Sequence, residues 1–263
     1  MYFSGKIVWI TGASSGIGEE LAVSVAAQGG TVVLSARSLE QLQRVQNRCT
    51  EAGGKSEIVI LDLSSQESIQ KAATDVLGKF GRIDVLVNNG GISQRGLVHE
   101  TAIEVDRRIM EVNFFGAVAL TKAVLPGMLV QEDGHIVVLS SVVGKIGFPV
   151  RSAYSASKHA LHGFFETLWA EYHDAGIRVT MICPGMVRTN ISFHALEGNG
   201  KEHGVMDDRQ NNGISAAACA KIIVRSIKRN RREVYIGREQ ILIYLRRYFP
   251  WLFFRIVSRF KPV

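Results

Sequence analysis

The sequence predicts an α/β protein in which helices flank a doubly wound parallel sheet, followed by a short C-terminal helical extension. Short apolar runs alternate along the chain with longer segments that have the periodicity of helices. These runs are apolar throughout, as expected for strands buried on both faces of a parallel sheet. Because no repeat interrupts the alternation, right-handed crossovers would join the strands into one sheet.

Seven apolar runs are expected to form the strands, and the segments between them the helices. The strands are predicted at residues 7–10, 31–35, 58–61, 85–87, 136–139, 179–182 and 234–236. After a first helix through Leu21 and Ala26, helices are predicted at about 39–52, 66–80, 105–129, 152–175 and 215–228. Residues 1–239 would form one domain with a glycine-rich substrate lid at 186–213, and residues 240–263 the extension.

Length and charge restrict the class of protein. A chain of 263 residues can bury one complete core. The formal net charge of +7 favours anionic partners, and the basic excess is concentrated from residue 228 onward. We expect no nucleic-acid partner, because this charge lies on no recognisable recognition helix or stacking platform.

Cysteine usage and hydropathy indicate a cytoplasmic protein. Three cysteines without C-x-x-C spacing favour reduced thiols over a disulfide scaffold, and seven histidines without metal-ligand spacing predict no metal site. The chain enters its first strand without a visible signal peptide. No uninterrupted apolar run reaches the ~18 residues of a spanning helix.

A glycine-rich turn follows the first strand and opens the first helix. Glycines let the backbone approach a pyrophosphate, and the free N–H groups of a helix N-terminus bind its charge. Strand, turn and helix in this order predict a Rossmann-type dinucleotide site at the turn that contains Gly12, Ser14, Ser15, Gly16, Ile17 and Gly18.

The residue after the second strand bears on the choice of cofactor. A site for NAD(H) usually has an acidic residue here that holds the ribose 2′-hydroxyl, whereas this chain has Arg37. A planar guanidinium suits a 2′-phosphate, so we predict NADP(H); the alternative is that Arg37 is simply solvated. Asp62, after the third strand, is placed to accept a hydrogen bond from the adenine edge.

Tyr154 and Lys158 are the candidate acid–base pair. Ser152 is the expected N-cap of their helix, on which positions i and i+4 share one face. An ammonium beside a phenol stabilises the phenolate and lowers the tyrosine pKa, so the pair can exchange a proton with an alcohol or carbonyl. The alternative is an ordinary surface pair.

Asn113 lies within an otherwise apolar helical face, among Val112, Phe114 and Ala117. A polar side chain there needs hydrogen-bond partners. It is either a satisfied core amide or a link in a proton relay.

Together these motifs resemble the short-chain dehydrogenase/reductase family over roughly residues 5–236. Gly90 departs from the family's usual alanine without removing a functional group. The matching motifs, in the family's order and spacing, are Thr11-Gly12-x-x-x-Gly16-x-Gly18, Asp62, Asn88-Asn89-x-Gly91, Asn113, Ser141, Tyr154-x-x-x-Lys158 and Pro184-Gly185-x-x-x-Thr189.

The resemblance implies an oxidoreductase that transfers a hydride between NADP(H) and a carbonyl/alcohol pair. Tyr154 would be the general acid or base, and Lys158 would hold the nicotinamide ribose. Ser141 would bind the substrate oxygen, and Asn113 would position a water that joins Lys158 to solvent. Besides these and the residues of the glycine turn, the cofactor would contact Arg37, Asp62, Leu63, Asn89, Gly90, Pro184, Gly185, Val187 and Thr189.

A weaker likeness, in residues 116–122, 151–154 and 204–207, is to a membrane-associated subgroup that includes acyl-dihydroxyacetone-phosphate reductase-like and steroid or retinoid dehydrogenase-like proteins. It implies a lipophilic substrate. The family further implies a homodimer or homotetramer in which the Asn113 and Tyr154 helices pack across a two-fold axis. The alternative of another class is a non-catalytic dinucleotide sensor or scaffold, which would have no need of the four acid–base residues.

Residues 240–263 mix aromatic, aliphatic and arginine side chains, and Pro250 should divide them into two short helices. Basic helices with an aromatic face can lie at a lipid surface, so one interpretation is peripheral membrane contact. The alternatives are that the extension covers the substrate cleft or packs on another subunit.

Overall fold

One seven-stranded parallel sheet forms the centre of the molecule, as the sequence predicts. The computed structural model describes residues 1–260, apart from the side chains of residues 208 and 209. The sheet order is β3-β2-β1-β4-β6-β7-β11, so the order in which the chain adds parallel strands reverses between β1 and β4. Ligands of such sheets bind at this reversal point. The strands are β1 (Ile7–Thr11), β2 (Thr31–Ala36), β3 (Lys55–Ile60), β4 (Val85–Asn88), β6 (Gly134–Leu139), β7 (Ile177–Pro184) and β11 (Glu233–Ile236).

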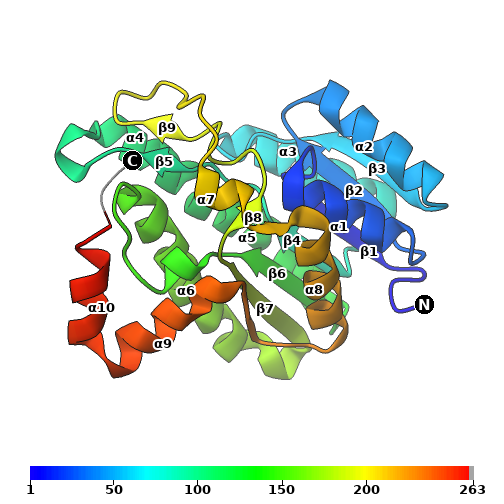
Figure 1. Cartoon of the computed structure of the whole chain (residues 1–263). Coiled ribbons are helices and arrows are strands. Elements are labelled where there is room, and N and C mark those ends of the chain that lie inside the picture. The colour runs from blue at the N-terminus through cyan, green and yellow to red at the C-terminus, as the bar shows by residue number, and fades with distance from the viewer. Residues whose placement is uncertain (261–263) are drawn as a thin grey trace.

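Helices cover both faces of the sheet (Figure 1). Successive side chains of a strand point to opposite faces. In β1, Val8 and Ile10 accordingly pack in one apolar core and Trp9 in the other. The first core contains α1 (Gly16–Ala26), α2 (Leu39–Glu51) and α8 (Ala216–Lys228), and the second contains α3 (Gln66–Phe80), α5 (Gly116–Val130) and α6 (Ser152–Tyr172).

The helix predicted at 105–129 is interrupted by a wider turn. The structure has α4 (Ile103–Met110), a π-helical turn η2 (Glu111–Phe115) and then α5. Asn113 lies in this π turn. Such turns accommodate one extra residue and are frequent at functional sites. Periodicity alone does not reveal them, because the apolar pattern continues on either side.

Taken together, α4, η2 and α5 form a continuous helical segment, Ile103–Val130. This segment is long and apolar enough, by length and composition, to cross a membrane. Its side chains Leu120, Val124 and Met128 are buried against the sheet. Within the part of the chain that the structure describes, this segment therefore has the position of a core helix.

The prediction that Ser152 caps the Tyr154 helix is wrong. Ser152 is already the first helical residue, and the preceding Arg151 makes no capping bond with its side chain. Instead, Gln94 Oε1 from the short strand β5 (Gln94–Arg95) accepts a hydrogen bond from the Ala153 N–H at 2.9 Å. A buried side chain distant in sequence thus satisfies the helix N-terminus.

Short elements organise the predicted lid at 186–213. They are β8 (Val187–Arg188), β9 (Leu196–Glu197) and α7 (Asp208–Asn211), followed by β10 (Ile214–Ser215). Strand β9 pairs with β5, and β10 pairs with β8. Backbone hydrogen bonds therefore tie the middle of the lid to β5, and they join its first strand, β8, to the strand that directly follows the lid. Single 3-10 turns lie at Val98–Glu100 (η1), Val142–Gly144 (η3), His173–Ala175 (η4) and Arg238–Gln240 (η5).

The extension forms two helices that meet at Pro250, which confirms the predicted break. They are α9 (Ile241–Tyr248) and α10 (Pro250–Val257); proline is well tolerated at the first position of a helix because no N–H is needed there. Figure 1 shows both helices at the side of the molecule opposite α2 and β3. Residues 261–263 of the predicted extension lie outside the described residues.

Candidate active site

The turn after β1 has backbone conformations that require glycine. Gly12 and Gly16 have φ angles of +63° and +59°, which L side chains rarely adopt. A Cβ atom on Gly18 would overlap the Gly12 carbonyl oxygen. Ser15 precedes α1 and makes no capping bond with its side chain, so the first N–H groups of the helix can face an anion.

The ends of β1 and β4 are joined beside this turn. Thr11 Oγ1 accepts hydrogen bonds from the N–H groups of Asn89 at 3.0 Å and Gly90 at 2.9 Å. Asn89 Nδ2 donates in return to the carbonyls of Thr11 and Gly12. A Cβ on Gly90 would lie 2.6 Å from Leu63 Cδ1, the end of a flexible side chain. The predicted cofactor residue Asn89 thus holds the glycine turn in shape.

Arg37 and Asp62 follow adjacent strands, β2 and β3. Asp62 Oδ1 accepts hydrogen bonds from the Ser64 N–H at 2.9 Å and hydroxyl at 2.7 Å. Burial opposes ionisation of Asp62, but the Ser64 hydrogen bonds and the positive charge of Arg37 lower its pKa overall. The exposed Arg37 guanidinium and an ionised carboxylate therefore lie close together at this edge of the sheet.

Arg44 is a cation that sequence reasoning missed. From α2 it donates to the Ser14 carbonyl at 3.2 Å and pairs with Glu19 in the first turns of α1. Arg48, one turn further along α2, pairs with the same carboxylate. The i, i+4 spacing of two arginines on the amphipathic helix was the available signal.

Tyr154 and Lys158 are both buried on one side of α6. Lys158 Nζ donates to the Leu139 carbonyl at 2.7 Å and lies 5.7 Å from the centre of the Tyr154 ring. Burial raises the pKa of Tyr154, and the charge of Arg151 and a hydrogen bond with Ser141 only partly oppose this. Burial also lowers the pKa of Lys158 to about 8. The expectation that Lys158 lowers the Tyr154 pKa is therefore wrong for this structure, in which desolvation dominates.

Ser141 is fixed between two strand ends. It follows β6, its Oγ donates to the Pro184 carbonyl at 3.2 Å, and it accepts a hydrogen bond from the Val143 N–H at 3.3 Å. Together with its hydrogen bond to Tyr154, these contacts place two hydroxyl groups side by side at the carboxyl ends of β6 and β7.

Asn113 is a fully satisfied core amide in this structure. Its Nδ2 donates to the Ile92 carbonyl at 2.9 Å and to Ser157 Oγ at 3.0 Å, while its Oδ1 accepts from the Ile92 N–H. A Cβ on Gly91 would lie 3.0 Å from Asn113 Oδ1 and 3.6 Å from Lys158 Nζ, so both groups border the same glycine. Asn113 thus joins the segment after β4 to α6.

The segment after β7 closes the other side of the site. Thr189 lies above the glycine turn, because a Cβ on Gly16 would come within 3.0 Å of Thr189 Cγ2. Gln210 Nε2 in the lid donates to Thr189 Oγ1 at 3.0 Å. Val187 is buried in the core beside α8, and a Cβ on Gly185 would overlap the Glu239 carboxylate. These residues bring the lid against the predicted cofactor site.

Two arginines hold the lid to the start of the Tyr154 helix. Asp207 in the lid forms ion pairs with Arg95 of β5 and, at 3.3 Å, with Arg151. The arginine side chains are only 14% and 12% exposed, so solvent and salt screen the attraction to Asp207 less than they screen a surface pair. Sequence reasoning did not find this contact, because its members are separated by 56 residues or more.

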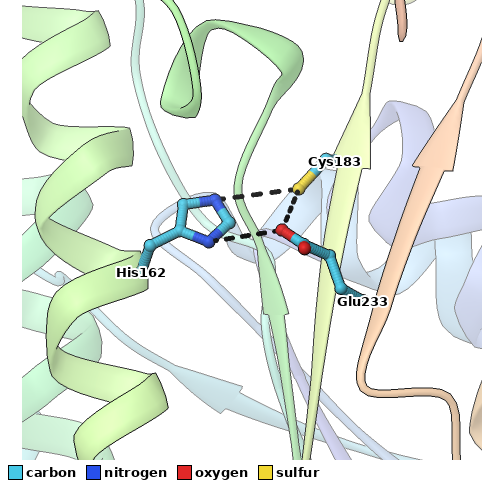
Figure 2. Close-up of side chains that lie close together, drawn as sticks. All are labelled: His162, Cys183 and Glu233. Carbon is cyan, nitrogen blue, oxygen red and sulfur yellow. Dashed lines mark hydrogen bonds and ion pairs between the residues drawn. The ribbon is translucent and has the colours of Figure 1, made fainter. Parts of the chain in front are cut away.

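A histidine, a cysteine and a glutamate meet beside the site, although their sequence spacing gave no sign of it. Figure 2 shows His162 on α6, Cys183 on β7 and Glu233 on β11 facing one another. The ring nitrogen, thiol sulfur and carboxylate oxygen with which they could hold a metal ion lie within 4.8 Å of one another. His162 Nε2 also lies 3.0 Å from Ser140 Oγ, which donates to the Lys158 carbonyl. The Lys145 ammonium lies 2.8 Å from the Glu233 carboxylate and balances its negative charge. Burial, together with this carboxylate, raises the pKa of the Cys183 thiol.

The residues present fit a bound dinucleotide. The glycine conformations, the overlaps that a Cβ would cause, and the free helix N-terminus form a backbone cradle at the reversal point of the sheet. The hydroxyl pair and the lysine lie one strand further along the same edge. Such a fold and site define a nicotinamide-dependent oxidoreductase.

The chain belongs to the short-chain dehydrogenase/reductase family, because the family model for short chain dehydrogenases matches residues 6–199. The mouse dehydrogenase/reductase SDR family member 7B is 41% identical over 98% of this chain and 81% of its own length. The SDR family protein 7-like of Anopheles gambiae is 44% identical over 98% of this chain and 84% of its own.

Solved structures agree with this assignment. A short-chain dehydrogenase/reductase from Burkholderia phymatum in complex with NAD has a TM-score of 0.83 at 26% identity, covering 100% of this chain and 98% of its own. A metagenomic short-chain oxidoreductase in complex with NADP has a TM-score of 0.76 at 29% identity, covering 90% and 98%. The neighbours thus bind either nicotinamide cofactor.

Proposed function

We propose that the protein is an NADP(H)-dependent oxidoreductase that interconverts an alcohol and a carbonyl group of a lipophilic substrate. The observation that carries the proposal is the hydrogen-bonded pair of Ser141 and Tyr154 beside the buried Lys158, at the carboxyl ends of the strands. The predicted cofactor residues surround the neighbouring reversal point of the sheet.

Each acid–base residue has a proposed role. A bound nicotinamide would supply or accept the hydride. Tyr154 would give its proton to a carbonyl oxygen during reduction and take one during oxidation, while Ser141 would orient that oxygen. Lys158 would hold the ribose. Since the Asn113 amide already has partners, we assign it a positioning role between Ile92 and α6.

NADP(H) is preferred in this proposal because of charge. Arg37 is exposed at the end of β2, so its guanidinium is available for a 2′-phosphate, whereas Arg44 near the glycine turn is paired with Glu19. The Asp62 carboxylate follows β3, and its Oδ1 is held by Ser64.

The lipophilic substrate class is supported by the surroundings of Tyr154. A small apolar cluster contains Tyr154 and Val143, with Phe148 and Leu196 packed against it. Leu196 belongs to the lid, so an apolar substrate group would meet apolar side chains from both the domain and the lid. A panel of medium-chain and steroid ketones, followed by NADPH absorbance, would identify the class.

The decisive experiment is Tyr154→Phe, which keeps the ring and removes the hydroxyl. NADPH binding, followed by nucleotide fluorescence, should be retained, and turnover should fall by at least about a hundredfold. Tyr172→Phe, at the other end of α6, is the matched control and should retain activity. Unchanged turnover in Tyr154→Phe would favour the alternative of a non-catalytic sensor or scaffold.

We further propose a homodimer or homotetramer that works in the cytoplasm. Phe115 is half exposed at the start of α5, where Phe114 contacts Phe164 of α6 edge to face, so an apolar surface continues across both helices. All three cysteines are free and buried, which suits a reducing compartment. Light scattering should show an oligomer that Phe115→Glu dissociates.

A further inference from the structure

The two C-terminal helices have an inner face that is anchored on the domain. Phe253 of α10 is buried with Val142 and Ile146, which belong to the segment that follows Ser141. The Phe148 and Phe260 rings lie 5.2 Å apart. Apolar side chains of both helices pack on this cluster: Leu242, Ile243, Leu245 and Val257. The helices are therefore held in a fixed orientation.

Their outer face carries a concentration of exposed aromatic side chains. Of the sixteen large apolar side chains that the described residues expose, six lie between residues 241 and 254, each 47% to 67% exposed. They are Ile241, Tyr244, Tyr248, Phe249, Trp251 and Phe254. Contiguous apolar patches on a protein surface usually mark a binding surface.

The charge on this face has one sign. Arg246, Arg247 and Arg255 are exposed among the aromatic side chains, and Arg246 lies over the Phe254 ring at 5.0 Å. No acidic residue occurs in the chain after Glu239. An isologous contact between two copies of this face would bring arginines against arginines, which opposes such a dimer.

From these observations we infer that the outer face of α9 and α10 is a docking surface for an anionic lipid bilayer. Tyrosine and tryptophan are enriched at the level of lipid headgroups, and arginines among them pair with lipid phosphates and other anionic groups. Because the inner face packs on the segment after Ser141, docking would hold that side of the active site toward the membrane.

The test uses the full chain and sedimented or floated vesicles of phosphatidylcholine, with or without 30 mol% phosphatidylserine. Binding to the anionic vesicles is expected, with loss at high salt. Each arginine near an anionic surface contributes roughly a fivefold gain in partitioning, so Arg246→Gln/Arg247→Gln should weaken binding by about 25-fold. The matched control, Arg229→Gln/Arg231→Gln, removes the same charge from the exposed turn between α8 and β11 and should bind almost as the parent does.

Aromatic insertion is tested separately. Trp251→Ser/Phe254→Ser should lower binding by at least about tenfold, whereas Val130→Ser, an exposed apolar position at the end of α5, should not. In a Trp169→Phe background, Trp9 and Trp251 remain, and Trp9 is fully buried. Quenching by brominated lipids would then report on Trp251. Circular dichroism would check that each variant is folded.

Three results would overturn the inference. The first is equal binding to neutral and anionic vesicles; the second is binding that Trp251→Ser/Phe254→Ser leaves unchanged. The third is a failure to bind the anionic vesicles; a dimer that this double variant dissociates would then assign the face to a second copy. None of these measurements needs substrate turnover, so they are independent of the proposed activity.

Discussion

Gln94 Oε1 accepts a hydrogen bond from the Ala153 N–H, so a side chain of β5 caps the helix that carries Tyr154 and Lys158. The same amide donates through Nε2 to Thr101 Oγ1 at 2.9 Å and to Ser152 Oγ at 3.2 Å. Gln94 is fully buried, and the strand it belongs to pairs with β9 of the lid. One glutamine therefore links the position of the acid–base pair to that of the lid.

Replacing Gln94 by alanine should destabilise the protein and reduce turnover. The Ala153 N–H would lose its partner in a buried place, which costs about 1–3 kcal/mol of unfolding free energy. Urea unfolding measures this change, and steady-state kinetics measure kcat. Gln131→Ala is the matched control, because that amide bonds only within the end of its own helix. Equal stability of the two variants would contradict the capping role.

Local patterns predicted those parts of this fold that depend on local physics. Apolar runs such as residues 7–10 appear as buried strands because both faces of the sheet are covered, and Pro250 divides the extension because proline cannot continue a helix. The glycine turn was predictable since glycine readily adopts the positive φ of Gly12, which L side chains rarely do.

The remainder depends on contacts that spacing does not encode. Gln94 and Asp207 look like ordinary polar loop residues until the fold brings them to Ala153 and Arg151. The expected effect of Lys158 on the Tyr154 pKa was wrong, because a pattern of residues contains no measure of desolvation.

Arg37→Asp should change the cofactor preference. The substitution replaces a guanidinium by a carboxylate beside Asp62, which would repel a 2′-phosphate and could hold a 2′-hydroxyl. We expect the ratio of kcat/KM for NADPH over NADH to fall by about a hundredfold, or about 2.7 kcal/mol. Lys55→Asp, an exposed site at the opposite end of β3, makes the same charge change and should leave the ratio unaltered. An unaltered ratio in Arg37→Asp would mean that this guanidinium does not select the cofactor.

Asp207→Asn should loosen the lid. The substitution removes the charge that attracts the Arg95 and Arg151 side chains, both of which are mostly buried. We expect KM for the substrate to rise by about tenfold, equivalent to about 1.4 kcal/mol, with a smaller change in kcat. Limited proteolysis should cut the variant faster within 186–213. Asp174→Asn, an exposed aspartate paired with His173, serves as the control. A proteolysis pattern like that of the parent would show that these ion pairs do not hold the lid.

The buried His162 should make the protein sensitive to acid. Burial and the nearby Lys145 charge lower the pKa of His162 to about 4, from an ordinary value of 6.5, so the folded protein keeps this ring neutral. Between pH 6.5 and about 4 the unfolded chain binds a proton that the folded one does not. The free energy of unfolding therefore falls as the pH falls through this window, by about 3 kcal/mol from this group, and is unaffected by it above pH 6.5.

His162→Gln should remove this contribution, because glutamine cannot take up the proton while its amide can still bond Ser140 Oγ. The difference in unfolding free energy between parent and variant, measured by urea titration at pH 7 and pH 4.5, should then change by about 2–3 kcal/mol in the variant's favour at the lower pH. His173→Gln, at an exposed position after α6, should follow the parent at both pH values. If His162→Gln also ran parallel to the parent, the ring would have to be protonated in the folded protein, facing the Glu233 carboxylate 3.6 Å away.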